Sequence, residues 1–476
     1  MDSPYLLESA LKDILRVVNP TEDDWSKRFT VINEIRAVIK SLEILRGATV
    51  EPFGSFVSNL FTRWGDLDIS IELPNGSYIP SAGKKHKQTL LLDVLNALKR
   101  KGGFHAIKYI SHARVPILKC DSNKDNISCD ISVNNLIGQM KSKMLFWIND
   151  LDPRFRDMVL IVKEWAKAHG INDPKNGTLN SYSLSLLIIF HFQTCEPAIL
   201  PPLSEFYPGN MAADLTGIRA IAEKNIEDIV SANTNRIKSD RSRMINTSSM
   251  ADLFISFLAK FSDINLKAET QGISTHNGQW EDINTNMIWQ PKTYALFIED
   301  PFEQPMNCAR AVGTRNLNKI AHAFQSSHQM LRSANQHPLA VLVRPEVLSI
   351  ISRSQVASSG ILGMNPQSIQ PQAYINPVRG PMRPHIQHPY NANQNQNRNG
   401  YSQANRGANA PTQLQQRYVY QNNPNMVNQI PLQGSRSQIP VQQFQRNPNN
   451  GVSQRPPGQS SRYQHFQPKW RPRPEK

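Results

Sequence analysis

Three aspartates lie in sequence settings that suit the binding of divalent cations. Asp66 and Asp68 open the run Asp-Leu-Asp-Ile-Ser-Ile, whose alternation of polar and apolar residues predicts a β-strand. Side chains alternate across a strand, so both carboxylates are expected on one face. Asp130 lies in a second alternating segment, residues 126–133. Carboxylates gathered on one face repel one another unless a cation lies between them. Hard divalent cations prefer such oxygen ligands and bring phosphate substrates with them.

A turn that carries Gly54 and Ser55 precedes the first two aspartates, and residues 56–61 after it are apolar and expected to be helical. Glycine lets a backbone approach a ligand closely, and a helix N-terminus offers free N–H groups to an anion. A lone Asp-x-Asp is common on solvated surfaces, whereas this turn, helix and third acid together are far more specific. Three carboxylates facing two Mg²⁺ ions form the arrangement for in-line phosphoryl or nucleotidyl transfer.

The elements around these residues predict an α+β fold. Helical spacing is seen over residues 4–18 and 22–46, and helical residues 88–101 end at a pair of glycines. Strands are expected at 49–53, from Asp66, and at 104–110, 114–120 and 126–133, giving a small mixed sheet with helices. Pro116 inside the fourth of these segments suggests a sheet edge. Residues 139–330 are mostly helical.

Charge and composition separate a C-terminal tail from the rest of the 476 residues. Residues 361–476 contain 13 Lys and Arg against a single acid, Glu475, and much of the net charge of +15. Gln, Asn, Pro and Arg dominate there, so no packed core is expected and the tail is predicted to be disordered. Its arginines and scattered aromatics suit single-stranded RNA binding, and its Gln and Asn content suits self-association into condensates. A solubilising linker is the alternative.

Other features of the sequence predict a soluble intracellular protein. The four cysteines show neither metal-ligand nor disulfide-framework spacing, which fits a reducing compartment. The segment after Met1 mixes acids into an amphipathic helix and does not resemble a signal peptide. The longest apolar run, within residues 184–190, is too short to span a bilayer, so no membrane partner is expected.

The motifs around Gly54-Ser55, Asp66-x-Asp68 and Asp130 resemble those of the DNA polymerase β-like nucleotidyltransferases. VKEWAKAHGI (162–171), NSYSLSLLIIFHF (180–192) and FIEDPFEQPMNCAR (297–310) are similar to segments of non-canonical poly(A) polymerases and terminal uridylyltransferases. The resemblance covers about residues 5–330 and is closest to the plant uridylyltransferases that tail unmethylated small RNAs. It implies four regions: residues 1–45, helices packing on the central domain; 46–138, a nucleotidyltransferase palm; 139–335, a helical central domain; and 336–476, the disordered tail.

The resemblance also assigns roles to individual residues. Lys163 and Lys167 are neighbours on one helix surface, and Lys163 lies on or beside its apolar stripe, so its ammonium either reaches solvent or meets an anion. By resemblance both lysines face the triphosphate, Ser181 binds phosphate, and Tyr182 stacks on the base. The implied metal ligands are Asp66, Asp68 and Asp130, which are also the catalytic residues and hold Mg²⁺, with Mn²⁺ as a substitute. The implied nucleotide-binding residues are Gly54, Ser55, Lys163, Lys167, Ser181, Tyr182, Asp300, Glu303 and Met306, with Lys141 and Ser142 near the ribose and base.

Two positions depart from the wider family and leave the choice of base open at the level of residues. Well-studied uridylyl members carry a His three residues beyond the Glu that matches Glu303, and here that position is Met306. The family's Asn-Thr pair after the third aspartate falls at Lys141-Ser142. The plant small-RNA group shares these departures, and resemblance to that group points to UTP.

The sequence therefore predicts an RNA uridylyltransferase that adds untemplated uridines from UTP to the 3′ ends of unmethylated microRNAs and siRNAs, marking them for degradation. A non-canonical poly(A) polymerase and a catalytically inactive RNA-binding scaffold are the alternatives. The complete set of three aspartates argues against the scaffold. The expected partners are UTP, the 3′ end of a single-stranded small RNA, and Argonaute. The expected location is the nucleus and cytoplasm, including RNA granules.

Overall fold

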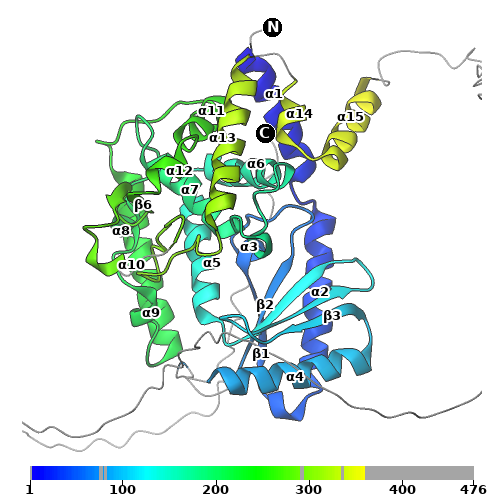
Figure 1. The fold of residues 1–476 in the computed structure, drawn as a ribbon. Coiled ribbons are helices and arrows are strands. Elements are labelled where there is room, and N and C mark those ends of the chain that lie inside the picture. Colours follow the sequence, from blue (N-terminus) through cyan, green and yellow to red (C-terminus); the bar gives the residue numbers. More distant parts are fainter. Residues whose placement is uncertain (1–2, 74–78, 80–82, 290–293, 334–336, 360–476) are drawn as a thin grey trace, which may run out of the picture. The chain divides into compact units, whose positions relative to one another are not determined.

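The computed structural model describes residues 3–73, 79, 83–289, 294–333 and 337–359 (Figure 1). The tail expected from residue 336 lies, from residue 360 onward, outside the described residues. No helix among the described residues combines the length and apolar character needed to cross a membrane.

A mixed sheet carries the aspartates. Its strands lie in the order β1-β2-β5-β4-β3, with β2 parallel to β5 and every other neighbouring pair antiparallel. The strands are β1 (Thr49–Phe53), β2 (Leu67–Glu72), β3 (Phe104–Ile110), β4 (Ile117–Ser122) and β5 (Ser128–Val133). The prediction of a sheet edge from Pro116 is wrong, because β4 lies between β5 and β3. Pro116 comes just before the first residue of β4, so its missing N–H removes no hydrogen bond from the strand.

One face of the sheet is covered by two helices, α2 (Glu22–Lys40) and α4 (Lys84–Lys101) (Figure 1). Buried side chains of both helices pack with Leu67, Ile69 and Ile71 of β2 in one hydrophobic cluster. Because neighbouring side chains of a strand alternate, Asp68 points to the opposite face. Burial of the apolar side chains of β2 against the helices therefore makes Asp68 point away from them.

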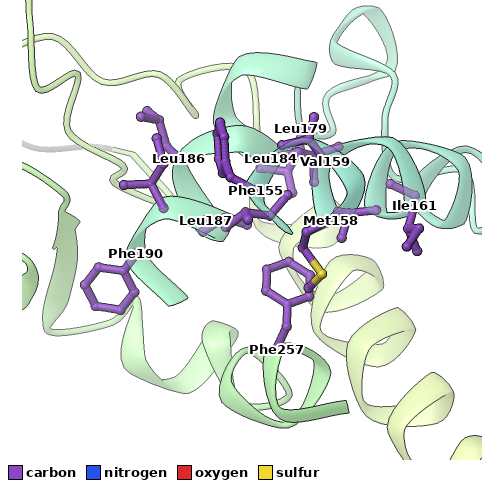
Figure 2. Packing of buried hydrophobic residues seen from close by; sticks show 14 of the residues in the cluster. Phe155, Met158, Val159, Ile161, Leu179, Leu184, Leu186, Leu187, Phe190 and Phe257 are labelled. Atoms are coloured by element: carbon purple, nitrogen blue, oxygen red, sulfur yellow. The ribbon is translucent and has the colours of Figure 1, made fainter. Parts of the chain in front are cut away.

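A second hydrophobic cluster forms the core of the helical region. Figure 2 shows its centre, where Phe155, Met158, Leu184 and Phe257 from three helices come together. The remaining helices are α1 (Ser3–Val18), α3 (Gly54–Val57), α5 (Leu136–Asn149), α6 (Arg154–Ala168), α7 (Ser181–Gln193), α8 (Leu203–Phe206), α9 (Met211–Asp214), α10 (Arg219–Ser239), α11 (Met250–Lys260), α12 (Ile264–Lys267), α13 (Thr314–Ser333), α14 (Pro338–Leu342) and α15 (Pro345–Ser359), with short 3₁₀ turns at Glu43–Leu45, Pro174–Asn176 and Met287–Trp289 and a hairpin of β6 (Gln271–Ser274) and β7 (Gln279–Asp282).

The mixed sheet and the helical region together confirm the predicted α+β class. The structure differs from the prediction in two of the four regions. Of the two N-terminal helices, α1 packs with the helical core, whereas α2 packs on the sheet. The boundary at residue 335 is too early, because α14 and α15 follow it and bury Leu342 and Ile351 in the helical core. Helical periodicity identifies an apolar face but not the surface that will cover it.

Candidate active site

The three aspartates lie at one end of the parallel strand pair. Asp68 and Asp130 are paired residues of β2 and β5, and Asp66 immediately precedes β2. Lys119 of β4 is paired with Asp130 on the other side. The sheet register therefore places two carboxylates and one ammonium side by side across three strands.

Charge repulsion and burial affect these groups strongly. Burial, and next the charges of Asp130 and Asp66, raise the pKa of Asp68 to about 7. Burial also raises the pKa of Asp130 despite its ion pair with Lys119. The Lys119 ammonium is paired with Asp130 Oδ1 and lies 4.0 Å from Asp66 Oδ2. Lys119 thus supplies positive charge where a cation would otherwise balance the aspartates.

The donor set fits a divalent cation, since it consists of carboxylate oxygens that repel one another. Asp130 Oδ1 is buried and makes no hydrogen bond of good geometry, although the Lys119 ammonium lies against it. Within the described residues, no group of three His, Cys, Asp or Glu side chains stands ready to hold a metal ion as the side chains now lie. Withdrawal of Lys119 and rotation of the exposed Asp66 side chain would open the three carboxylates to a shared cation.

The backbone of the turn at Gly54 lies directly against the Asp68 side chain. The φ of Gly54 is +68°, and a Cβ at this position would lie 1.9 Å from Asp68 Oδ2. Only glycine can therefore occupy the position without displacing the carboxylate. The Gly54 N–H donates to Ser142 Oγ at 2.7 Å, so Ser142 supports the turn from α5. Ser55 lies beside it at the start of α3 and lines the cavity described next.

A cavity of about 490 Å³ extends from the aspartates to the helical region. Its lining includes Asp66, Asp68, Lys163, Lys167 and Ser181. The Lys163 ammonium is buried and donates to the Leu60 carbonyl oxygen at 2.6 Å. Burial, and next the charge of Lys167, lower the pKa of Lys163 to about 8. Both lysines therefore line the cavity, and their contact with a triphosphate remains a prediction.

The start of α7 forms another part of the cavity wall. Asn180 caps the helix by accepting from the Ser183 N–H at 2.7 Å. This leaves Ser181, whose Oγ donates to Asn172 Oδ1 at 3.3 Å, at the first helical position. Ser181 and Tyr182 line the cavity. Their expected contacts with phosphate and base remain predictions.

Lys141 of α5 joins the cavity to two acids behind it. Its ammonium pairs with Asp300 and, at 2.7 Å, with Glu303 Oε2, and lies 5.6 Å from the centroid of the Tyr182 ring. Attraction to these acids outweighs burial and raises the pKa of Lys141. Arg114 also pairs with Glu303, at 2.8 Å. The two cations balance the charges of Asp300 and Glu303, and of these four residues Lys141 is the one that lines the cavity.

Met306 lies in the turn that carries Asp300 and Glu303, and in the described part of the chain these two acids do not line the cavity either. The Met306 carbonyl oxygen accepts from the Asp300 N–H at 2.8 Å, and its own N–H donates to Glu303 at 2.9 Å. The acceptor on Glu303 is its backbone carbonyl oxygen, so these two backbone bonds close the turn that holds the two acids. Met306 is not among the residues that line the cavity in the described part of the chain.

Three residues of the site, Lys119, Arg114 and Trp64, are not among those predicted from the sequence. Lys119 could have been found from the alternation of residues 117–122, once β4 was placed beside β5. Arg114 belongs to a loop and gives no local signal. Trp64, two residues before Asp66, lines the cavity and is 41% exposed.

A mixed sheet with two paired aspartates, a glycine turn against them, and a basic cavity define the class of nucleotidyltransferases with a polymerase β-like palm. The family described as "Poly(A) RNA polymerase, mitochondrial-like, central palm domain" matches residues 7–149. Among solved structures, the Cid1 poly(U) polymerase has a TM-score of 0.56 at 23% identity, covering 71% of this chain and 97% of that chain. The mtPAP structure in complex with UTP has a TM-score of 0.55 at 21% identity, covering 71% of this chain and 72% of that one.

Among curated proteins, HESO1 of Arabidopsis thaliana is 48% identical over 441 residues, which cover 91% of this chain and 83% of HESO1. The poly(A) RNA polymerase GLD2 of Mus musculus is 29% identical over 287 residues, covering 59% of this chain and 55% of GLD2. The chain therefore belongs to the same family as HESO1, and it is an RNA terminal nucleotidyltransferase, as the sequence predicts. Palms of this family generally use divalent metal ions, in keeping with the three carboxylates.

Proposed function

We propose that the protein transfers uridylates from UTP to the 3′ ends of small RNAs, with unmethylated microRNAs and siRNAs as acceptors, and so marks them for degradation. Membership of the HESO1 family supports the reaction class. The observation that supports uridylate over adenylate is the Lys141 ammonium beside Tyr182 and Asp300.

An ammonium has three N–H donors and no acceptor. Two of the Lys141 donors go to Asp300 and Glu303, which leaves one for a ligand in the cavity. The edge of uracil alternates carbonyl oxygen, N3–H and carbonyl oxygen, so a cation beside carboxylates matches it. Adenine and cytosine place an amino donor on that edge, where it would face the ammonium. A site built on hydrogen bonds rejects a base that leaves its polar groups unpaired.

The proposed cofactor is Mg²⁺, or Mn²⁺ in its place, held by Asp66, Asp68 and Asp130. Bound there, it would lower the pKa of the RNA 3′-hydroxyl and stabilise the charge on the phosphates of UTP. Asp130 would lie nearest the attacking hydroxyl and help to accept its proton. Lys163, Lys167, Ser55 and Ser181 would bind the triphosphate.

Stacking on Tyr182 would hold the base without distinguishing it from other bases, because every base has a π-face. Selection would therefore depend on Lys141 and the two acids that it joins.

The test compares UTP with ATP, each labelled and supplied singly to the purified full-length protein with an RNA acceptor. We expect kcat/KM for UTP to exceed that for ATP by about tenfold or more. Lys141→Met should lower the UTP value by roughly 10- to 100-fold and the ATP value much less. Lys141→Arg is the matched control, because it retains the positive charge and donors. An unchanged UTP/ATP ratio in Lys141→Met would refute this basis for selection.

A poly(A) polymerase is the second candidate. Met306 stands where the sequence comparison expects a histidine in uridylyl enzymes, and several relatives are named poly(A) RNA polymerases. Preferential incorporation of ATP by the unmodified protein would establish this alternative.

The proposal also covers the RNA that is tailed, the protein that presents it and the cellular location. RNA that ends in a 2′-hydroxyl would be tailed and RNA that ends in a 2′-methoxy group would not, which the same assay tests. Argonaute would present the small RNA, and the basic tail would bind RNA or drive association into condensates. The protein would act in the nucleus and cytoplasm, including RNA granules.

A further inference from the structure

An exposed tryptophan stands at the mouth of the cavity, on the loop that joins α3 to β2. Trp64 is two residues from Asp66, lines the cavity and has 41% of its surface exposed. An exposed tryptophan on its own is unremarkable in a folded protein. At Trp64, however, hydrogen bonds hold the backbone on both sides of the residue, and two arginine side chains lie near the ring.

The backbone around Trp64 is held rigidly. Buried Arg28 donates through Nη2 to the carbonyl oxygens of Arg63, at 3.1 Å, and Gly65, at 2.7 Å. The Arg63 N–H donates to Val18, and the Gly65 N–H closes a turn onto Thr62. A fixed support reduces the conformational entropy that the ring loses when a ligand stacks on it.

Two guanidinium groups lie near the ring. Arg63 Cζ is 5.9 Å and Arg344 Cζ 5.8 Å from a Trp64 ring centroid. Arg344 comes from the segment between α14 and α15. Its guanidinium donates two hydrogen bonds to Glu164, of 3.0 and 2.8 Å, and its backbone N–H donates a third, of 3.1 Å. Arg63 lies 3.6 Å from Asp24. About a third of each arginine side chain stays exposed, so both can still reach a ligand.

Aromatic rings interspersed with basic side chains are the usual means of binding single-stranded nucleic acid, in which bases stack and phosphates meet the cations. We propose that Trp64, Arg63 and Arg344 form the binding site for the terminal nucleotides of the RNA acceptor. A base at the 3′ end stacks on Trp64, and the adjoining phosphates contact the two arginines. The neighbouring position of Asp66 brings the terminal hydroxyl to the carboxylates.

This inference rests on the proposed function only in requiring an RNA acceptor, and it is independent of the nucleotide that is added. Stacking does not distinguish bases, so the site accepts any terminal base. A purely structural role for Trp64 is the competing explanation, since the ring also connects Arg344 to the palm.

The experiment uses the full-length protein, no nucleotide, and a short RNA with the fluorescent base 2-aminopurine at its 3′ end. Stacking on tryptophan quenches this base. A second RNA carries 2-aminopurine well inside the strand, so RNA bound elsewhere on the chain gives a different signal. We expect the unmodified protein to quench the terminal probe and not the internal one.

Trp64→Leu should abolish the terminal quenching and raise the dissociation constant or KM for RNA by roughly 5- to 100-fold, leaving KM for UTP unchanged. Trp64→Phe keeps a ring and should retain part of the affinity. Tyr5→Leu removes another exposed aromatic side chain, on α1, and should match the unmodified protein.

Equal quenching by Trp64→Leu and the unmodified protein would overturn the inference. It would also be overturned if both Trp64 variants lowered the melting temperature and weakened UTP and RNA binding together, since that indicates a structural role. Neither result bears on UTP against ATP. Conversely, preferential incorporation of ATP over UTP would refute the proposed function and leave this site standing.

Discussion

Asp68 and Asp130 face each other as register partners on adjacent parallel strands, and Lys119 is the partner of Asp130 on the next strand. This arrangement concentrates negative charge at one end of the sheet and sets an ammonium against it. The ammonium and a divalent cation compete for the same carboxylates. Much of the behaviour of the free protein should follow from that competition.

Lys119→Met should make the metal-free protein less stable and increase its affinity for Mg²⁺. Without the ammonium the aspartates repel one another, and an incoming cation meets no like charge. An interaction of about 1 kcal/mol corresponds to roughly fivefold tighter binding. Melting temperatures measured in EDTA and across a Mg²⁺ titration test this. Lys108→Met, which alters the exposed partner of Lys119 on β3, is the matched control. A Mg²⁺-induced shift equal to that of the unmodified protein would contradict the competition.

Lys163 should make nucleotide binding sensitive to pH. Burial and the charge of Lys167 lower its pKa to about 8, while Asp68 attracts its proton. The ammonium is therefore present below about pH 8 and is lost as the pH rises through that value. We expect kcat/KM for UTP to fall above pH 8, approaching about tenfold per pH unit. Lys163→Arg should move the fall to higher pH, because arginine keeps its charge. Lys224→Arg, on the exposed face of α10, should leave the profile unchanged. Identical profiles for Lys163→Arg and the unmodified protein would show that Lys163 only supports Leu60.

Gly54→Ala should abolish activity by displacing Asp68. The added methyl group would lie 1.9 Å from Asp68 Oδ2 on a backbone with φ of +68°. We expect kcat to fall about 100-fold or more and the free energy of unfolding to fall by about 1–2 kcal/mol. Turnover and urea denaturation measure the two effects. Gly83→Ala is the control, since its φ is −60° and a methyl group added there would have no atom within 4 Å. Normal turnover in Gly54→Ala would show that the turn tolerates a side chain beside Asp68.

Local sequence patterns were sufficient to predict the chemistry of the site but not its neighbours across the sheet. Alternation in the segments around Asp68 and Asp130 predicted the strands and the direction of the side chains. Which residue lies opposite Asp130 depends on strand order and register, and these are set by packing over the whole sheet. For this reason no local pattern indicated that Lys119 pairs with Asp130.

The same limit explains the corrections to the predicted regions. Both α1 and α2 have an apolar face, and only tertiary packing decides that α2 covers the sheet. Leu342 and Ile351 lie near a long polar stretch, so the short helices that bury them were assigned to the tail. Lys141 was placed near the base by resemblance, but its ion pairs reach 159 and 162 residues along the chain to Asp300 and Glu303.

Whether Asp68 and Asp130 hold the catalytic metal ion can be measured by incorporation of labelled UTP into RNA by Asp68→Asn and Asp130→Asn. Each change removes a carboxylate from the proposed metal site while keeping its size. We expect each variant to lose activity by about 1,000-fold or more. Its melting temperature in EDTA should equal or exceed that of the unmodified protein, because repulsion between the carboxylates is relieved. A folded variant that retained more than about a tenth of the activity would contradict the assignment of these aspartates to catalysis.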